Sequence, residues 1–272
     1  MPIVFAGAAS HAPGMTAWPD AVPADQKDRL YAAYDELRRR LEAARVERLI
    51  VLTSEHWTNF FLDHIGAFCV GRAQTYEGPV EPWLKVEKRS VPGDPEMAEA
   101  IVEAAYANDV EPSFAYELHF DHGTMLPLHF LTPRMDVPVV PVYFNTLAAP
   151  QPAASRCMEF GRIIGEVARR SHHRVGIVAT GGLSHDPGER AHGTIDAAFD
   201  RRFLDQMAHG DLAALAAYRR SDFVAAGAGA FEVLTWIALR GALAEAHGDI
   251  LAYEAVVPWA TGMGMIGFSG VA

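Results

Sequence analysis

Histidines follow the ends of three apolar runs in the sequence. The runs PIVFAGA and RLIVLTS lead to His11 and His56, and the run VGIVAT leads through GGLS to His185. A fourth histidine, His122, opens a segment of helical composition. Imidazole binds metals and changes charge near neutral pH. These four residues are therefore candidates for metal binding or for proton transfer.

Each of these histidines also has a simpler interpretation. A single histidine after a strand is more often a loop residue or a hydrogen-bonded cap than a ligand. Four histidines in equivalent places favour a shared site. The other histidines among the 12 lie in polar or helical surroundings, or close to His122, and are expected to be surface or packing residues.

Glu232 is an acidic residue within the apolar stretch AGAGAFEVLTWIAL. Burying a carboxylate is costly unless it is paired or bound to a metal. The alternative is that Glu232 stabilises the start of a helix through the helix dipole. Two histidines and one carboxylate are typical of non-haem Fe(II) oxygenases, but catalytic zinc sites use them too. The ligand types alone leave the metal open.

Strands and helices must alternate to place these residues together. Apolar runs predict strands at 2–8, 47–56, 66–71, 137–145, 174–185, 252–259 and 261–268. Helical periodicity or composition predicts helices at 24–45, 95–108, 152–170, 194–219 and 229–246, and one that starts near 121–123. The segment 72–93, rich in glycine, proline and charge, is predicted to be a loop over the sheet.

This alternation predicts one α/β domain over residues 1–272. Its central sheet would be mixed but mostly parallel, with helices on both faces. Ligands of such sheets bind beyond the carboxyl ends of the strands. The site is therefore expected at that edge, where the histidines follow the strands.

Composition narrows the kinds of partner. A net charge of -11 argues against nucleic acid as the main partner. The cysteines, Cys69 and Cys157, form no CxxC pattern, which fits a reducing cytoplasm without a disulfide framework. No apolar run approaches the ~20 residues that cross a bilayer, and the N-terminus lacks the basic start of a signal peptide. We expect a cytoplasmic protein that forms a homo-oligomer and does not bind membranes.

Five motifs in order resemble the class III extradiol ring-cleavage dioxygenases. They are SHAPGM, SEHWTNFF, DHGTMLPL, TGGLSH and FEVLTWIALRGAL, with TGMGMIGF near the end. The similarity runs from about residue 3 to about residue 268. This family includes the protocatechuate 4,5-dioxygenase catalytic chain and 2,3-dihydroxyphenylpropionate 1,2-dioxygenase. The stretches FCVG, VPVVPVYFN and VPWATGMGMIG look closer to the second of these branches.

The resemblance implies a role for each candidate residue. His11, His56 and Glu232 would bind Fe(II). His185 would be the acid–base histidine, and His122 a second-sphere histidine that places substrate and handles protons. A catechol-type ring, with or without a carboxylated side chain, would react with O₂ by meta-cleavage to a ring-opened, semialdehyde-type product.

The sequence leaves the substrate contacts open. Five residues flank the presumed site and could contact a ring substituent: Trp57, Asn59, Phe60, Trp259 and Thr261. Core packing is the alternative for the aromatic ones. An anionic tail would need a partner such as Arg156, Arg190 or a backbone amide.

The chain departs from the family pattern in three places. Asp186 follows His185 where relatives often carry an amide, and a carboxylate there would favour the charged imidazolium. The stretch between His185 and Glu232 is shorter than in the dihydroxyphenylpropionate branch. Nothing in the chain resembles the small helical α subunit that covers the protocatechuate enzyme's site, so that subunit is either separate or absent.

Two other functions remain open from the sequence. A metal-dependent hydrolase would use zinc and a bound water. A non-catalytic member of the fold would only bind metal or a partner. The presence of His185 and His122 beside the three candidate ligands His11, His56 and Glu232 favours the dioxygenase. A protein that only binds would need neither proton-transfer histidine.

Overall fold

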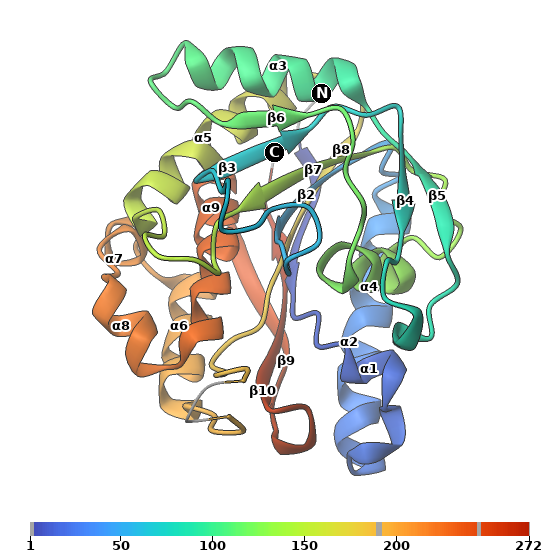
Figure 1. Cartoon of the computed structure of the whole chain (residues 1–272), viewed down its shortest axis with the longest axis vertical. Helices are drawn as coiled ribbons and strands as arrows, with labels where there is room; N and C mark the ends of the chain where they lie inside the picture. The colour runs from blue at the N-terminus through green and yellow to red at the C-terminus, as the bar shows by residue number, and fades with distance from the viewer. Residues whose placement is uncertain (1–2, 189–191, 244–245, 272) are drawn as a thin grey trace.

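A mixed sheet of eight strands runs through the part of the chain that the structure describes (Figure 1). The computed structural model describes residues 3–188, 192–243 and 246–271. In spatial order the strands are β6 (Ser113–Ala115), β3 (Phe68–Gly71), β7 (Val139–Phe144), β2 (Arg48–Ser54), β8 (Val175–Thr180), β1 (Ile3–Ala9), β10 (Thr261–Ser269) and β9 (His247–Val256). The pairs β6–β3, β7–β2, β2–β8 and β8–β1 are parallel, and the other three are antiparallel.

Helices cover both faces of this sheet, as predicted (Figure 1). One face packs against α2 (Ala24–Ala43) and α4 (His122–Leu131), and the other against α3 (Pro95–Tyr106), α5 (Ala154–Arg170), α6 (Ala197–His209) and α9 (Val233–Leu243). An apolar core lies on each face of the sheet, and alternate residues of β2 pack into one core or the other. Side chains along a strand point to opposite faces. None of the described helices is long and apolar enough to cross a membrane.

The segment 72–93 differs from its prediction as a loop. It contains β4 (Thr75–Gly78) and β5 (Arg89–Pro92), which pair antiparallel, with a 3₁₀ turn, η2 (Pro82–Leu84), between them. Tyr76 and Val91 lie opposite each other and both are buried. A strand of four residues with one or two buried side chains shows too little alternation to be recognised from sequence.

The helices of the C-terminal third are also more broken than predicted. The expected helix 194–219 divides at Gly210 into α6 and α7 (Leu212–Ala216), because Asp211 caps the second helix, and α8 (Arg220–Ala225) follows. The expected helix 229–246 begins as a 3₁₀ turn, η3 (Ala228–Glu232), and continues as α9; residues 244–245 lie outside the described residues. The next strand, β9, starts at His247, ahead of the predicted 252–259.

The carboxyl ends of three adjacent parallel strands share one edge of the sheet. β8 lies between β2 and β1. The residues that follow these strands are His11 after β1, His56 after β2 and His185 after β8. The start of α4 brings His122 to this group and the end of η3 brings Glu232. The predicted convergence therefore follows from the order of the strands.

Close packing of α5 on α9 fixes the helix that follows Glu232. A Cβ on Gly161 would lie 1.8 Å from the backbone oxygen of Ala238, and one on Gly165 would lie 2.4 Å from that of Ala242. Only glycine permits this approach of two backbones. The contact holds α9 in place relative to the sheet edge.

Candidate active site

The carboxylate of Glu232 lies between two imidazoles. Its Oε2 is 3.3 Å from Nε2 of His11, and its Oε1 is 3.1 Å from Nε2 of His56. The backbone N–H of Gly182 also donates to Oε2. Glu232 is 3% exposed. Burial by itself would raise the pKa of Glu232, but the two histidines outweigh burial and hold that pKa well below its usual value.

Asp121 orients His56. Its Oδ2 accepts a hydrogen bond from the His56 backbone N–H at 2.9 Å and lies 3.1 Å from the ring Nδ1. Its Oδ1 caps α4 by accepting from Gly123 N–H. An ionised carboxylate only accepts, so Nδ1 carries a proton and Nε2 faces Glu232. Burial raises the pKa of Asp121, but His56 outweighs burial and lowers that pKa to about 2.

His122 lies beside His56, with ring centroids 4.0 Å apart. Oε1 of Glu81 lies 2.7 Å from its Nδ1. One nitrogen from each of His11, His56 and His122 falls within a group less than 4.8 Å across, which could hold a metal ion. The site therefore offers two donor sets that share His11 and His56. Either Glu232 or His122 completes the set.

His185 occupies the loop after β8. Its Nδ1 lies 2.9 Å from the backbone oxygen of Leu183, and its Nε2 lies 4.0 Å from Oε1 of Glu232. A carbonyl only accepts, so Nδ1 carries the proton and Nε2 of the neutral ring keeps a lone pair. A Cβ on Gly182 would lie 2.6 Å from the ring, and one on Gly229 would lie 2.2 Å from it. The two glycines therefore make room for this ring.

A buried carboxylate on α6 anchors the loop that carries His185. Oδ1 of Asp200 accepts from Ser184 N–H at 2.8 Å, and Oδ2 accepts from the Ser184 hydroxyl and from Tyr253 OH, both at 2.9 Å. Burial raises the pKa of Asp200, and the hydrogen bonds from Ser184 and Tyr253 oppose that rise. Asp200 was not predicted from the sequence, because it lies in a helical stretch without a motif.

Asp186 joins the His185 loop to the turn that carries Glu232. Its Oδ1 accepts from Ala228 N–H at 2.8 Å, and Gly229 N–H donates to the backbone oxygen of His185 at 3.0 Å. These two hydrogen bonds fix the acid–base candidate relative to the carboxylate. An effect of Asp186 on the imidazolium of His185 stays a prediction.

A cavity of about 470 Å³ opens over the histidines and the carboxylate. Three of the residues expected to contact substrate line it, namely Trp57, Trp259 and Thr261. Asn59 does not line it; its side chain donates instead to the backbone oxygen of His119 at 2.9 Å.

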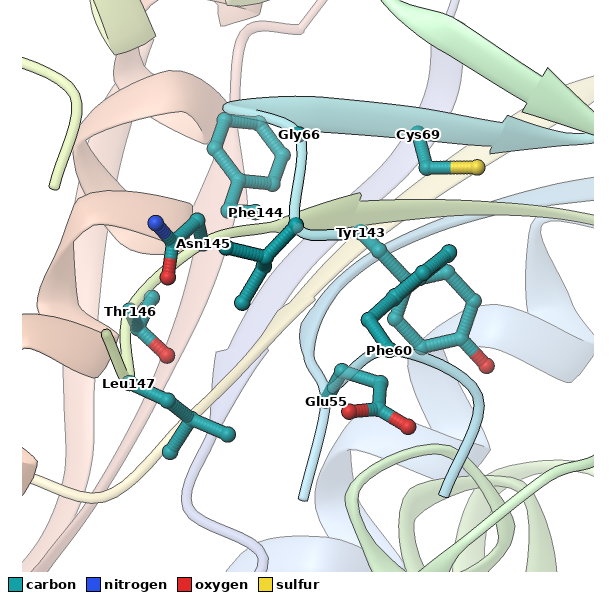
Figure 2. A pocket seen from close by; sticks show the side chains of 10 residues that line it. Glu55, Phe60, Gly66, Cys69, Tyr143, Phe144, Asn145, Thr146 and Leu147 are labelled. Carbon is teal, nitrogen blue, oxygen red and sulfur yellow. The ribbon is translucent and has the colours of Figure 1, made fainter. Parts of the chain in front are cut away.

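A second, much smaller cavity lies beside Glu55 (Figure 2). Its volume of about 10 Å³ has room for roughly one water molecule. Phe60 lines this cavity rather than the larger one, and its ring lies 6.1 Å from that of Tyr143. Oε1 of Glu55 accepts from Asn59 N–H, and burial raises the pKa of Glu55. This space is too small for an aromatic substrate.

Arg156, one of the two arginines that could bind an anionic tail, does not line the described cavity. Arg156, on α5, donates to the backbone oxygen of Asp109 and pairs with Glu111 at 3.6 Å. Arg190 lies outside the described residues. His192 is a described basic residue that lines the cavity.

Comparison with known families decides the identity. Residues 6–264 match the family described as the catalytic LigB subunit of aromatic ring-opening dioxygenase. The chain belongs to this family. It is a ring-cleaving dioxygenase of the class III extradiol type, as the motifs predicted.

Curated relatives carry a common name. The dioxygenase is 30% identical to the 2,3-dihydroxyphenylpropionate/2,3-dihydroxicinnamic acid 1,2-dioxygenase of Burkholderia vietnamiensis (strain G4 / LMG 22486), in an alignment that covers 84% of this chain and 86% of the relative. It is 28% identical to an enzyme with the same name and the suffix 2 from Dechloromonas aromatica (strain RCB), over 94% of each chain.

A solved structure shares the fold. The crystal structure of an uncharacterized protein from Escherichia coli K12 has a TM-score of 0.64 and 16% sequence identity. The match covers 98% of the dioxygenase and 100% of that chain.

Proposed function

We propose that the dioxygenase depends on Fe(II) and that His11, His56 and Glu232 hold the metal. The observation that carries this proposal is one buried carboxylate within 3.3 Å of two imidazole Nε2 atoms. Two nitrogen donors and one oxygen donor suit a divalent iron ion with positions left for other ligands. When bound, iron would supply a centre at which catechol and O₂ meet.

Two arguments favour Glu232 over His122 as the third donor. The carboxylate contacts both imidazoles and brings the negative charge that a cation needs, and its burial is costly without a cationic partner. The ring of His122 is held from the other side by Glu81 and lines the cavity. His122 is therefore proposed to contact substrate.

His185 is proposed to move the proton. A catechol loses a hydroxyl proton when it binds a metal as catecholate. Nε2 of His185 can accept that proton, because its Nδ1–H is committed to the backbone oxygen of Leu183. The same nitrogen can return the proton to an oxygen of the product. The dense packing of Gly182 and Gly229 on the ring keeps this nitrogen in place.

The proposed substrate is a catechol-type ring, and among such rings one that carries a carboxylated side chain. The names of the curated relatives support this choice. Trp57, Trp259 and Leu147 give the cavity apolar walls against which a ring can pack. Meta-cleavage would then give a ring-opened, semialdehyde-type product.

The alternatives make different demands. A zinc hydrolase would use the same donors with a bound water and needs no O₂. Family membership favours the dioxygenase over both this hydrolase and a non-catalytic metal-binding protein.

We also propose that residues 1–272 act as one catalytic domain of a cytoplasmic homo-oligomer. A separate small α subunit, where one exists, would cover the site.

Oxygen consumption separates these functions. The protein is loaded with Fe(II) without air and mixed with a panel of substituted catechols and aminophenols. Admission of air should start O₂ uptake and the appearance of a yellow ring-opened product for at least one catechol. Zinc loading should give neither. Absence of O₂ uptake with every compound, from protein that holds iron, would contradict the proposal.

A further inference from the structure

Glu81 engages His122 through a single carboxylate oxygen. Oε1 lies 2.7 Å from Nδ1 of the ring and accepts from the backbone N–H of the same residue at 3.0 Å. Both side chains are largely buried, 13% exposed for Glu81 and 12% for His122. Glu81 comes from the segment between β4 and η2, which is remote from α4 in the sequence.

Backbone hydrogen bonds fix the segment that carries Glu81 on both sides of this residue. Val80 N–H donates to the backbone oxygen of Phe120 at 3.0 Å, and Leu84 N–H donates to that of Glu81 at 3.2 Å. The hydroxyl of Thr16 donates a hydrogen bond to the backbone oxygen of Leu84. The backbone around Glu81 is therefore fixed relative to α4.

This contact decides which ring nitrogen carries the proton. An ionised carboxylate only accepts hydrogen bonds, so Nδ1 of His122 must be the N–H nitrogen. In the neutral ring, Nε2 then keeps its lone pair and is the nitrogen left for the cavity that His122 lines. Without this acceptor, the ring could take either tautomer and could rotate about its χ2 angle.

A purely structural role does not account for Glu81. Asp121 already caps α4 by accepting from Gly123 N–H. The second oxygen of Glu81, Oε2, is buried and has no hydrogen-bond partner among the described residues. Burying an unpaired polar atom costs stability. An apolar residue would fill this position without this cost.

We propose that Glu81 is a positioning residue for ring cleavage: it fixes the tautomer and orientation of His122 so that Nε2 accepts a hydrogen bond from a substrate hydroxyl. The inference rests on the proposed function, in which His122 contacts substrate. It assigns to Glu81 an effect on turnover through His122 and no contact with metal or substrate.

Two substitutions separate the acceptor from its charge. Glu81→Leu removes the acceptor. Glu81→Gln keeps a carbonyl oxygen that can accept from both N–H groups of His122 and removes only the charge. Glu77→Leu is the matched control, because Glu77 is an exposed glutamate on β4 of the same hairpin. Glu81→Asp, with its shorter side chain, replaces the leucine variant if that variant does not fold.

The first measurement needs no activity. Long-range ¹⁵N–¹H spectra of the histidine rings, recorded on metal-free protein, report which ring nitrogen carries the proton. The signals of His122 are those lost in His122→Gln. Wild type, Glu81→Gln and Glu77→Leu should show the Nδ1–H tautomer, and Glu81→Leu should show a mixture. An unchanged Nδ1–H tautomer in Glu81→Leu would overturn the proposal.

The second measurement is the kinetics of iron-loaded protein with its best catechol. Misplacement of a group that contacts substrate costs up to about 100-fold, so kcat of Glu81→Leu should fall by as much as that factor. The iron content should stay near the wild-type value, and Glu81→Gln should restore most of kcat. Equal kcat in Glu81→Leu and Glu77→Leu would also overturn the proposal. Failure of the proposed function itself would appear separately, as wild-type protein without O₂ uptake.

Discussion

Asp200 accepts hydrogen bonds from both the backbone N–H and the hydroxyl of Ser184, at 2.8 and 2.9 Å. Ser184 immediately precedes His185, so this pair sets where the acid–base candidate lies. Asp200 belongs to α6 and is completely buried. The contact therefore links the core of the protein to the placement of a single imidazole.

Replacement of Asp200 by alanine should destabilise the fold. It leaves the buried donors of Ser184 and the partly buried hydroxyl of Tyr253 without their acceptor, at a cost of about 3 kcal/mol in the free energy of unfolding. Urea denaturation followed by circular dichroism measures this change. Asp205→Ala, an exposed position on the same helix, should change it by less than about 0.5 kcal/mol. Equal stability of the two variants would contradict the role given to Asp200.

The stability of the fold should also depend on pH through Asp200. Burial raises its pKa above the ordinary 3.8. The folded state therefore binds this proton more tightly than the unfolded state. The resulting stability is fully present below pH ~3.8 and is lost as pH rises through the raised pKa.

Asp200→Asn isolates this effect, because asparagine does not titrate. The unfolding free energy of wild type minus that of Asp200→Asn should fall as pH rises through this window and then stay level. Chemical denaturation at a series of acidic to neutral pH values gives the difference. A difference that grows with rising pH would show that the pKa is lowered instead.

Iron binding should distinguish the two donor sets. Glu232→Gln keeps the shape of the side chain but removes its charge. It should weaken Fe(II) binding by more than ~100-fold, which is the most that losing a hydrogen-bond partner of a metal ligand usually costs. His122→Phe should leave the iron content unchanged. Elemental analysis after anaerobic loading measures both. Iron lost from His122→Phe but kept by Glu232→Gln would assign the metal to the three histidines.

Removal of the imidazole of His185 should separate turnover from metal binding. His185→Phe should retain iron and lower kcat by roughly 10²–10⁴-fold, the usual contribution of a positioned acid or base. Stopped-flow absorbance and O₂ uptake give kcat, and elemental analysis gives the iron content. If the variant loses iron instead, His185 is a ligand and the assignment is wrong.

A single methyl group at Gly229 should have a related effect. Its Cβ would lie 2.2 Å from the ring of His185, so Gly229→Ala must displace that ring. We expect kcat to fall by at least about tenfold, since small misplacements of catalytic groups cost up to 10²-fold. Gly66→Ala, where the nearest atom is the Ser113 hydroxyl at 3.2 Å, is the control. Unchanged kcat in Gly229→Ala would show that the ring position is not critical.

The sequence predicted the residues that local order brings together. His11, His56 and His185 follow strands that are adjacent and parallel, so their meeting required only the α/β pattern. Glu232 was conspicuous because a carboxylate rarely stands in an apolar stretch unless it has a partner. The mixed sheet with helices on both faces is confirmed by the structure.

The partners of these residues could not be predicted, because they depend on contacts between distant segments. Glu81 reaches His122 only through the β4–β5 hairpin, which the sequence analysis took for a loop. Asp200 meets Ser184 only when α6 packs beside the strand ends. Phe60 lines the small cavity beside Glu55 and not the larger one, and the backbone of Trp57, three residues earlier, has a φ of 58° in the left-handed region.

The separation of the proposed donors along the chain has a consequence for how the enzyme is made. Of the proposed donors, His11 and His56 come first in the sequence, and Glu232 follows His56 by 176 residues. A growing polypeptide on the ribosome exposes the histidines long before α9 exists to support the carboxylate. The full proposed donor set can therefore form only after Glu232 and the start of α9 have been synthesised.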